Sequence, residues 1–308
     1  MTLPVNFKRP MLAINYDDVS EQPILTYCSE KLNGIRVIFF GGVAYSRSLK
    51  PLPNKTLQKL AHDNAEVLQG CDGEVIAGDK YSIDVLQRSN SFCMKVGKQD
   101  DFCVYLFDKF HQTQPWFQRY CNLIQLQDSL PKHVEVLEHF VVRPWNGKLP
   151  LSLSWVNLDL FEAEILSKGG EGVMLRDAFG EYKQNRSGKV RPELQKVKRM
   201  QDLEAIIIGY NQYETNLNEA TTDERGFTKR SNSKEGKELV EQLGGLVLLY
   251  NGKTFSCGSG FTQEQRKELW LNKGWLVGQT AKIQYFGFSP DGIPLLPVFL
   301  DFRSDLDM

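Results

Sequence analysis

A lysine followed by a glycine turn and an arginine lies early in the chain, in Glu30-Lys31-Leu32-Asn33-Gly34-Ile35-Arg36. Such a turn can present the Lys31 amine to a phosphate, because glycine lets the backbone bend close to a ligand. Arg36 supplies a permanent charge and a planar set of donors that suit phosphate oxygens. On its own, the segment also fits an ordinary charged turn at the edge of a strand.

Two further basic segments have the composition of phosphate-binding elements. Residues 46–54 combine two cations, including Arg47, with two hydroxyls and rigid prolines. Residues 194–198 alternate, so Lys196 and Lys198 point to the same face if the segment is a strand. Two lysines on one face repel each other unless an anion lies between them, and a polyphosphate is such an anion. The alternatives are a proline-rich loop and a solvated edge strand.

Two carboxylates lie where they could hold a cation. Glu74 precedes an apolar run, and Glu171 follows Gly169-Gly170. Carboxylates at the starts of strands suit Mg²⁺ or Mn²⁺, which take oxygen ligands and accompany phosphates. Glu74 and Glu171 are therefore candidate metal ligands, although each taken alone is better explained as a solvated acidic turn.

The hydrophobic pattern predicts two regions that would position these residues. Strands and helices are mixed up to about residue 200, with a hairpin around Gly41-Gly42. The remainder is mostly β, with a hairpin at Asn251-Gly252 and one helix capped by Thr262. This second pattern predicts a small barrel of the OB type. The predicted helices are 56–68, 116–126 and 262–272, and the predicted strands are 36–46 (as a hairpin), 104–108, 172–177, 205–210, 246–250, 253–257, 280–288 and 295–302.

Residues 211–237 fit neither core, because they are polar and contain few large aliphatic side chains. Composition alone favours a disordered surface loop. The other interpretation is a long insertion between barrel strands that grips nucleic acid. Its second half is rich in basic residues suited to phosphate contact, including Arg225, Lys229, Arg230 and Lys234.

Length and composition limit the class of protein. The 308 residues suit two domains, and 41% hydrophobic residues provide for packed cores. The net charge of −1 means that any nucleic-acid surface must be local. The six cysteines form no CxxC pair, so we expect no zinc site. No signal peptide or membrane-spanning run is evident, and we expect an intracellular protein in the cytoplasm or at the site of DNA.

In order and spacing, these segments resemble the motifs of the covalent nucleotidyltransferases, which include ATP-dependent DNA ligases, RNA ligases and mRNA capping enzymes. Residues 31–36 resemble motif I (KxDGxR), with Asn33 where aspartate is usual. The other resemblances are Ser46-Arg47 to motif Ia, Asp72-Gly73-Glu74 to motif III, Leu106-Phe107-Asp108 to motif IIIa, residues 171–176 to motif IV and residues 194–198 to motif V. Several motifs in family order are far more specific than any one of them.

The C-terminal part, with residues 254–261 and 285–303, resembles the OB domain of the minimal viral and phage DNA ligases. The resemblance implies an α+β fold in which a nucleotidyltransferase domain of ATP-grasp-like antiparallel sheets and helices precedes an OB-fold domain. Residues 1–200 would form the adenylyltransferase domain and residues 201–308 the OB domain. Residues 211–237 would then be a latch that clasps DNA, in preference to a disordered loop.

The resemblance also implies roles for single residues. Lys31 attacks the α-phosphate of ATP, the AMP passes to the 5′-phosphate of a nick, and the 3′-hydroxyl then expels AMP. The attacking amine must be neutral, and neighbouring cations disfavour its charged form. The implied catalytic residues are Lys31, Arg36, Lys196 and Lys198; the ATP-binding residues are Ser29, Arg47, Glu74, Phe107, Met174, Lys196 and Lys198; the metal ligands are Glu74 and Glu171; and the DNA-binding residues are Asn33, Arg36, Arg176, Arg225, Lys229, Arg230 and Lys234.

The expected function is therefore sealing of nicked duplex DNA by a monomer that uses ATP and Mg²⁺ (or Mn²⁺), in DNA repair or replication. An RNA ligase or a capping-type nucleotidyltransferase uses the same lysine chemistry and remains the alternative. A non-catalytic nucleic-acid-binding protein with an OB module is a rival of another class. The co-occurrence of Lys31, Glu74, Glu171, Lys196 and Lys198 favours an enzyme over that rival.

Overall fold

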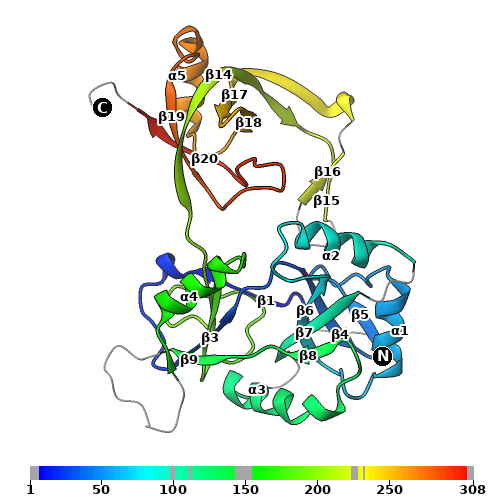
Figure 1. Cartoon of the computed structure of the whole chain (residues 1–308). Helices are drawn as coiled ribbons and strands as arrows, with labels where there is room; N and C mark the ends of the chain where they lie inside the picture. Colours follow the sequence, from blue (N-terminus) through cyan, green and yellow to red (C-terminus); the bar gives the residue numbers. More distant parts are fainter. Residues whose placement is uncertain are drawn as a thin grey trace. The chain divides into compact units, whose positions relative to one another are not determined.

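The computed structural model describes residues 7–97, 101–110, 113–142, 155–222, 228–231 and 233–303. The chain divides into two compact units: the first contains the described residues up to Lys198 together with Thr222, and the second contains the other described residues from Arg199 onward (Figure 1). The described helices of the first unit are α1 (Lys55–Asp63), α2 (Val85–Met94), α3 (Trp116–Gln125) and α4 (Leu158–Ser167), and the second unit contributes α5 (Gln263–Leu271). None of the helices in the described part of the chain has the length and apolar run that a membrane-spanning helix requires.

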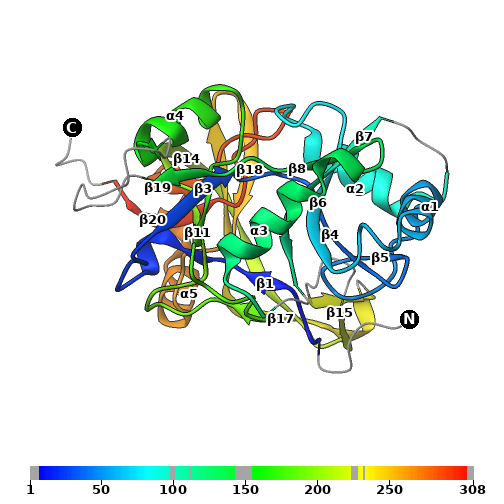
Figure 2. The same ribbon diagram turned by 90° about the horizontal axis from the view of Figure 1, so that it is seen from below.

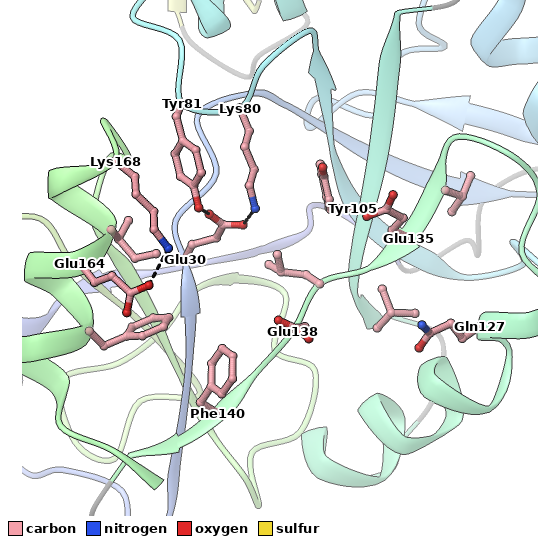
Figure 3. Close-up of a pocket in the computed structure, with 15 residues that line it drawn as sticks. Glu30, Lys80, Tyr81, Tyr105, Gln127, Glu135, Glu138, Phe140, Glu164 and Lys168 are labelled. Atoms are coloured by element: carbon pink, nitrogen blue, oxygen red, sulfur yellow. Dashed lines mark hydrogen bonds and ion pairs between the residues drawn. The ribbon is translucent and has the colours of Figure 1, made fainter. Parts of the chain in front are cut away.

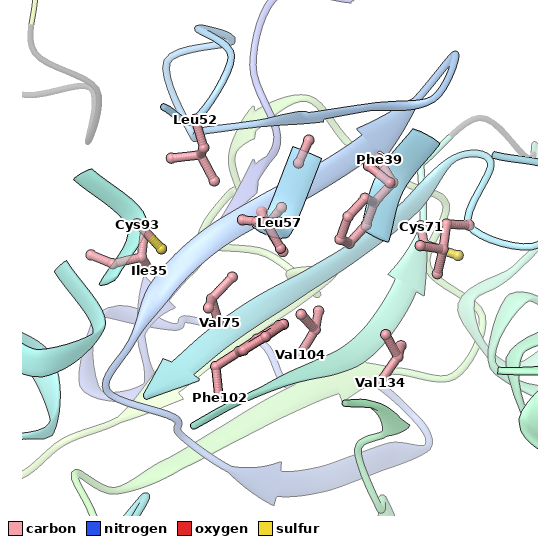
Figure 4. Close-up of a cluster of buried hydrophobic side chains, with 14 of the residues drawn as sticks. Ile35, Phe39, Leu52, Leu57, Cys71, Val75, Cys93, Phe102, Val104 and Val134 are labelled. Atoms are coloured by element: carbon pink, nitrogen blue, oxygen red, sulfur yellow. The ribbon is translucent and has the colours of Figure 1, made fainter. Parts of the chain in front are cut away.

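One sheet of the first unit has the strand order β5-β4-β6-β7-β8. Its strands are β4 (Ile35–Phe40), β5 (Val43–Tyr45), β6 (Cys71–Ala77), β7 (Phe102–Lys109) and β8 (Val134–Val136). Val37, Val75 and Val104 are fully buried on this sheet. They form one hydrophobic core with residues of α1 and α2, which pack against the sheet (Figures 2 and 4). The predicted hairpin around Gly41-Gly42 is present between β4 and β5.

A second sheet of the first unit has the order β10-β9-β3-β11-β13-β2. Its strands are β2 (Ile14–Asn15), β3 (Thr26–Glu30), β9 (Phe140–Val142), β10 (Trp155–Val156), β11 (Val173–Asp177) and β13 (Leu194–Val197). The central strand β11 is antiparallel to both β3 and β13. A short parallel pair, β1 (Met11–Leu12) with β12 (Asn185–Arg186), lies outside these two sheets.

The second unit is built on one sheet with the order β18-β17-β14-β19-β20. Its strands are β14 (Gln201–Asn216), β17 (Lys237–Tyr250), β18 (Lys253–Cys257), β19 (Thr280–Tyr285) and β20 (Val298–Phe302). Ile207, Leu248 and Ile283 are fully buried in its core. The predicted capping box is present at the start of α5, where Thr262 and Gln265 each bond the backbone N–H of the other. The strands and the helix of this unit thus follow the predicted order.

The polar segment 211–237 forms regular structure in its described part. β14 and β17 extend into it and pair as far as Asn216 with Lys237. Beyond them, β15 (Ala220–Thr222) pairs with β16 (Thr228–Arg230). The Asn218 side chain donates hydrogen bonds to the carbonyls of Ser231 and Ser233, at 3.0 and 2.9 Å. Backbone pairing and this amide replace the apolar core that the segment lacks, which explains why its composition pointed to a loop.

Candidate active site

Three neighbouring strands of the second sheet bring Lys31, Glu171 and Lys198 together. Lys31 directly follows β3, Lys198 directly follows β13, and Glu171 lies two residues before β11, which runs between them. Lys198 Nζ donates to Glu171 Oε1 at 2.6 Å, and Lys31 Nζ donates to Oε2 of the same carboxylate. The Lys31 backbone N–H also donates to the Gly172 carbonyl at 2.8 Å. The two lysines therefore share one carboxylate.

The charge of Glu171 is set by these neighbours. Burial alone would raise the pKa of its carboxyl group, but Lys31 and Lys198 together hold that pKa below its ordinary value. Glu171 is therefore ionised at neutral pH. The pKa of the Lys196 amine is lowered as well, by burial and by the positive charges of Lys31 and Arg186, and for an amine this disfavours the charged form.

A pocket of about 390 Å³ opens beside Lys31, and both sheets of the first unit contribute to its walls. Ser29 and Met174 face each other across the β3–β11 pair, and Phe107 comes from β7 of the other sheet. Ser29 is buried (1% exposed) at the pocket wall, so bulk solvent hardly reaches it. The lining residues are Met11, Leu12, Ala13, Ser29, Glu30, Lys31, Leu32, Arg36, Arg47, Glu74, Phe107, Leu137, Met174, Arg176, Arg186, Leu194 and Lys196.

Positive charges crowd the pocket around Arg47. Burial and the neighbouring Arg36, Arg9 and Arg186 lower the pKa of the Arg47 guanidinium. Burial is the largest cause of the depressed pKa at both Arg47 and Lys196, and repulsion by neighbouring cations, with Arg186 among them at both positions, adds to it. A bound anion would relieve that repulsion, so the electrostatics favour a phosphate-bearing ligand.

Arg36 is held by a carboxylate at the pocket wall. Asp72 accepts hydrogen bonds from its Nε and Nη2, and the Tyr182 hydroxyl donates to Asp72 at 2.6 Å. The guanidinium carbon of Arg36 lies 4.7 Å from the centroid of the Phe107 ring. Gly34, two residues earlier, fits because a Cβ there would lie 2.3 Å from the Val75 carbonyl oxygen. Glycine is therefore required at this position for the close approach of β4 and β6, rather than for a turn alone.

Behind Phe107, a buried ion-pair network supports the pocket. Asp108 is fully buried and accepts hydrogen bonds from Arg119 Nε at 2.7 Å and from Arg176 Nη1 at 2.9 Å. Burial alone would raise the pKa of Asp108, but Arg119 and Arg176 hold it below its ordinary value. The guanidinium carbon of Arg176 lies 5.1 Å from the Phe107 ring centroid. Arg176 thus ties the pocket wall to the core.

The second unit carries a family signature, and the whole chain has known structural relatives. Residues 235–303 match the DNA ligase OB-like domain family. The structure of Lig E DNA ligases, described as binding DNA with a minimal scaffold, has a TM-score of 0.70 at 21% identity, over 96% of this chain and 99% of that chain. The Chlorella virus DNA ligase-adenylate has a TM-score of 0.50 at 26% identity, over 96% of this chain and 100% of that chain. No curated protein sequence gives a significant match.

The chain has the fold of an ATP-dependent DNA ligase. The resemblance to this family that the sequence motifs carried is confirmed, and so is the α+β class with a nucleotidyltransferase domain followed by an OB-fold domain. The pocket residues come from both large sheets of the first unit, which meet at this pocket.

Most of the residues predicted for the site lie together. Ser29, Lys31, Arg36, Arg47, Glu74, Phe107, Met174, Arg176 and Lys196 line the pocket. Glu171 is connected to the pocket through its contact with Lys31, and Lys198 through its contact with Glu171. Asn33 lies in the turn after Lys31, outside the pocket lining. Lys229, Arg230 and Lys234 are exposed on the insertion of the second unit, and Arg225 lies outside the described residues.

Glu74, a predicted site residue, has an unusual environment for a carboxylate. It lies within β6, and not at the start of a strand as the sequence predicted. Burial raises its pKa from 4.5 to about 7, and the cations Arg36 and Lys31 offset only part of that effect. Among the described residues, no group of three or more His, Cys, Asp or Glu side chains forms a metal-binding cluster. Glu74 and Glu171 nevertheless fit Mg²⁺, which is commonly held by one or two carboxylates together with phosphate oxygens and water.

Sequence reasoning missed some of the pocket. Met11, Leu12, Ala13 and Leu137 line it but carry no chemical signal in the sequence. The sequence placed Arg186 in a basic stretch but gave it no role. In the structure Arg186 pairs with Leu12 between β1 and β12, and it lines the pocket. Long-range pairing of two short strands determines this position, which local composition does not reveal.

Proposed function

We propose that this ligase seals breaks with a 5′-phosphate and a 3′-hydroxyl in nicked duplex DNA, through a lysyl-AMP intermediate on Lys31. In the first step the Lys31 nitrogen, after losing a proton, forms a bond to the α-phosphorus of ATP while the α–β P–O bond breaks and pyrophosphate leaves. The DNA 5′-phosphate then takes the AMP from Lys31. The 3′-hydroxyl finally attacks that phosphate, loses its proton and releases AMP.

The observation that carries the proposal is the Lys31–Glu171–Lys198 arrangement beside a pocket with an aromatic wall and crowded cations. We assign Phe107 and Met174 to the two faces of the adenine and Ser29 to its edge. Arg36, Arg47, Lys196 and Lys198 would contact the phosphates, and cation crowding at Arg47 and Lys196 supports that role.

We assign Glu74 and Glu171 to Mg²⁺ (or Mn²⁺). The ion, when bound, stabilises negative charge that develops on the transferred phosphoryl group. Glu171 is ionised and beside Lys31, which suits a carboxylate that keeps a cation and the nucleophile near one phosphate. Glu74, with a pKa of about 7, gains its charge most readily when a cation or a ribose hydroxyl faces it.

The proposal gives each unit its own role. Residues 1–200 form the adenylyltransferase domain, residues 201–308 the OB domain, and residues 211–237 a latch that clasps DNA. Asn33, Arg36 and Arg176 would contact the nick, while Arg225, Lys229, Arg230 and Lys234 would contact phosphates along the duplex. Because Arg176 is hydrogen-bonded to Asp108 and lies over the Phe107 ring, we regard support of Phe107 as its main role and contact with DNA as its second role. The enzyme would act as a monomer where DNA is repaired or replicated.

An RNA ligase is the second candidate, because it uses the same lysine chemistry. The match of residues 235–303 to the DNA ligase OB-like family favours DNA. The test is incubation with ATP labelled in the α-phosphate and Mg²⁺, followed by a chase with a nicked DNA duplex or a matched RNA break. We expect label to pass from protein to the DNA 5′-end and then to free AMP as the nick closes. Transfer to the RNA break alone would overturn the DNA assignment.

A further inference from the structure

A second cavity, of about 660 Å³, lies in the first unit and shares Glu30 and Leu137 with the candidate active site. Figure 3 shows Glu30 near the middle of its wall, with Lys80 and Tyr81 pointing toward its carboxylate. Lys80 and Tyr81 belong to the turn that follows β6. Glu30 is the last residue of β3 and directly precedes Lys31, so whatever holds Glu30 also holds the backbone of the proposed nucleophile.

Both carboxylate oxygens of Glu30 are occupied by this turn. The Tyr81 hydroxyl donates to Oε2 at 2.9 Å, and Lys80 Nζ donates to Oε1. The Glu30 side chain is 11% exposed, so the contacts are partly shielded from water. Lys80 Nζ also lies 5.1 Å from the ring centroid of Tyr81 and 5.6 Å from that of Tyr105. Charge-assisted bonds in a shielded, aromatic setting hold a side chain more firmly than exposed ones.

The same turn contacts the segment that carries Glu171. Gly169 has φ +92°, and a Cβ there would lie 2.7 Å from the Tyr81 carbonyl oxygen. The backbone at Tyr81 and the backbone two residues before Glu171 therefore touch, at a position that accepts only glycine. The turn after β6 thus contacts the chain on both sides of the Lys31–Glu171 ion pair.

We propose that Lys80 and Tyr81 are positioning residues for lysine adenylation: through Glu30 and Gly169 they fix Lys31 against Glu171. Neither side chain takes part in bond making. Lys80 in addition neutralises the Glu30 carboxylate, which would otherwise add an uncompensated negative charge next to the nucleophile. The inference rests on the proposed function, since it concerns the first step of that reaction.

The test compares single-turnover formation of lysyl-AMP by the wild-type protein and by Lys80→Met. We expect the rate constant at saturating ATP to fall about tenfold, while the ATP concentration for half-maximal rate changes less than about twofold, because the nucleophile is misplaced and the pocket is intact. Lys80→Arg, which keeps the charge, should recover most of the rate. Tyr81→Phe keeps the ring and removes only the hydroxyl, so it should show a smaller loss in the same direction.

Glu164→Gln is the matched control, because Glu164 lines the same cavity but pairs with Lys168 on the surface of α4. It should adenylate at the wild-type rate. A second readout is closure of a nick that already carries a 5′-AMP, which does not require attack by Lys31. Lys80→Met should close this nick at the wild-type rate.

Two results would overturn the inference. One is wild-type lysyl-AMP formation by both Lys80→Met and Tyr81→Phe. The other is an equal loss in adenylation and in closure of the pre-adenylated nick, which would show a general structural defect. A wild-type protein that forms no lysyl-AMP would instead overturn the proposed function, so the two failures are distinguishable.

Discussion

Lys198 Nζ lies 2.6 Å from Glu171 Oε1, while the other oxygen of this carboxylate accepts a hydrogen bond from Lys31. One carboxylate thus fixes the proposed nucleophile and a second cation at the ends of three adjacent strands. Antiparallel pairing of β11 with β3 and β13 determines this geometry, so the site depends on the register of the sheet. A one-residue slip would turn the alternating side chains to the other face.

Removing the charge of Glu171 should slow the first chemical step. Glu171→Gln keeps the size of the side chain but weakens its contacts with both lysines. We expect lysyl-AMP formation to fall about 100-fold, because a small misplacement of a reacting group has effects of this size. Rapid-quench measurement of label transfer from ATP gives the rate. A rate equal to that of Glu164→Gln would show that the Lys31–Glu171 contact has no catalytic consequence.

Glu74 predicts a pH-dependent stability. The pKa of Glu74 is about 7 in the folded protein and 4.5 for an unperturbed glutamate, which stands for the unfolded chain, so the folded protein binds the proton more tightly. This contribution to stability is present below pH 4.5 and is lost as the pH rises through 7. Glu74→Gln should therefore stabilise the protein at pH 8, by on the order of 2 kcal/mol, and have little effect at pH 4.5. Urea unfolding at the two pH values measures the difference, and a larger gain at the lower pH would contradict it.

The buried Asp108 network should dominate the stability of the first unit. Asp108→Ala leaves the fully buried Arg119 without its ion-pair partner, and it removes the partner of Arg176. Breaking a buried pair in this way costs about 3–5 kcal/mol. Asp63→Ala, which removes the exposed partner of Lys59, should leave the denaturation midpoint nearly unchanged. Equal midpoints for the two variants would be incompatible with this assignment.

The sequence alone predicts features that depend on adjacent residues better than features that depend on residues distant in the chain. Local signals predicted the hairpins at Gly41-Gly42 and Asn251-Gly252 and the capping of α5, because each depends on a few adjacent residues. Helices α2 and α4 were not predicted, and α1 ends at Asp63 rather than near residue 68. Helices α2 and α4 each pack against a strand that is distant in the sequence, β4 for α2 and β3 for α4, and the local pattern of residues does not reveal those partners.

The sequence named most of the polar residues that line the pocket, and their roles in the proposed reaction stay predictions. The resemblance to the family motifs named nine of the residues that line the pocket: Ser29, Lys31, Arg36, Arg47, Glu74, Phe107, Met174, Arg176 and Lys196. It did not predict that Asp72 would bind Arg36 or that Asp108 would bind Arg119 and Arg176. These contacts join residues far apart in the chain, and a charged residue in isolation does not reveal its partner.

The insertion of the second unit should contribute to DNA binding and not to adenylation. Deletion of residues 214–234, with the strands rejoined by Asn-Gly, should weaken binding of a nicked duplex and leave lysyl-AMP formation unchanged. Lys229→Ala combined with Lys234→Ala should reduce the slope of log affinity against log salt by about 2, because each lysine would neutralise one phosphate. Lys59→Ala, an exposed lysine of α1, is the control and should keep the wild-type slope. An unchanged slope in the double variant would remove these lysines from the interface.

The central claim is that Lys31 carries AMP. The most direct measurement is incubation with ATP and Mg²⁺, followed by mass spectrometry of the proteolysed protein, in parallel with Lys31→Arg. The proposed mechanism predicts one AMP on the peptide that contains Lys31 and none on the variant, although the substituted guanidinium keeps a positive charge beside Glu171. An adduct of the same yield in Lys31→Arg, or AMP on another lysine of the wild-type protein, would contradict the claim.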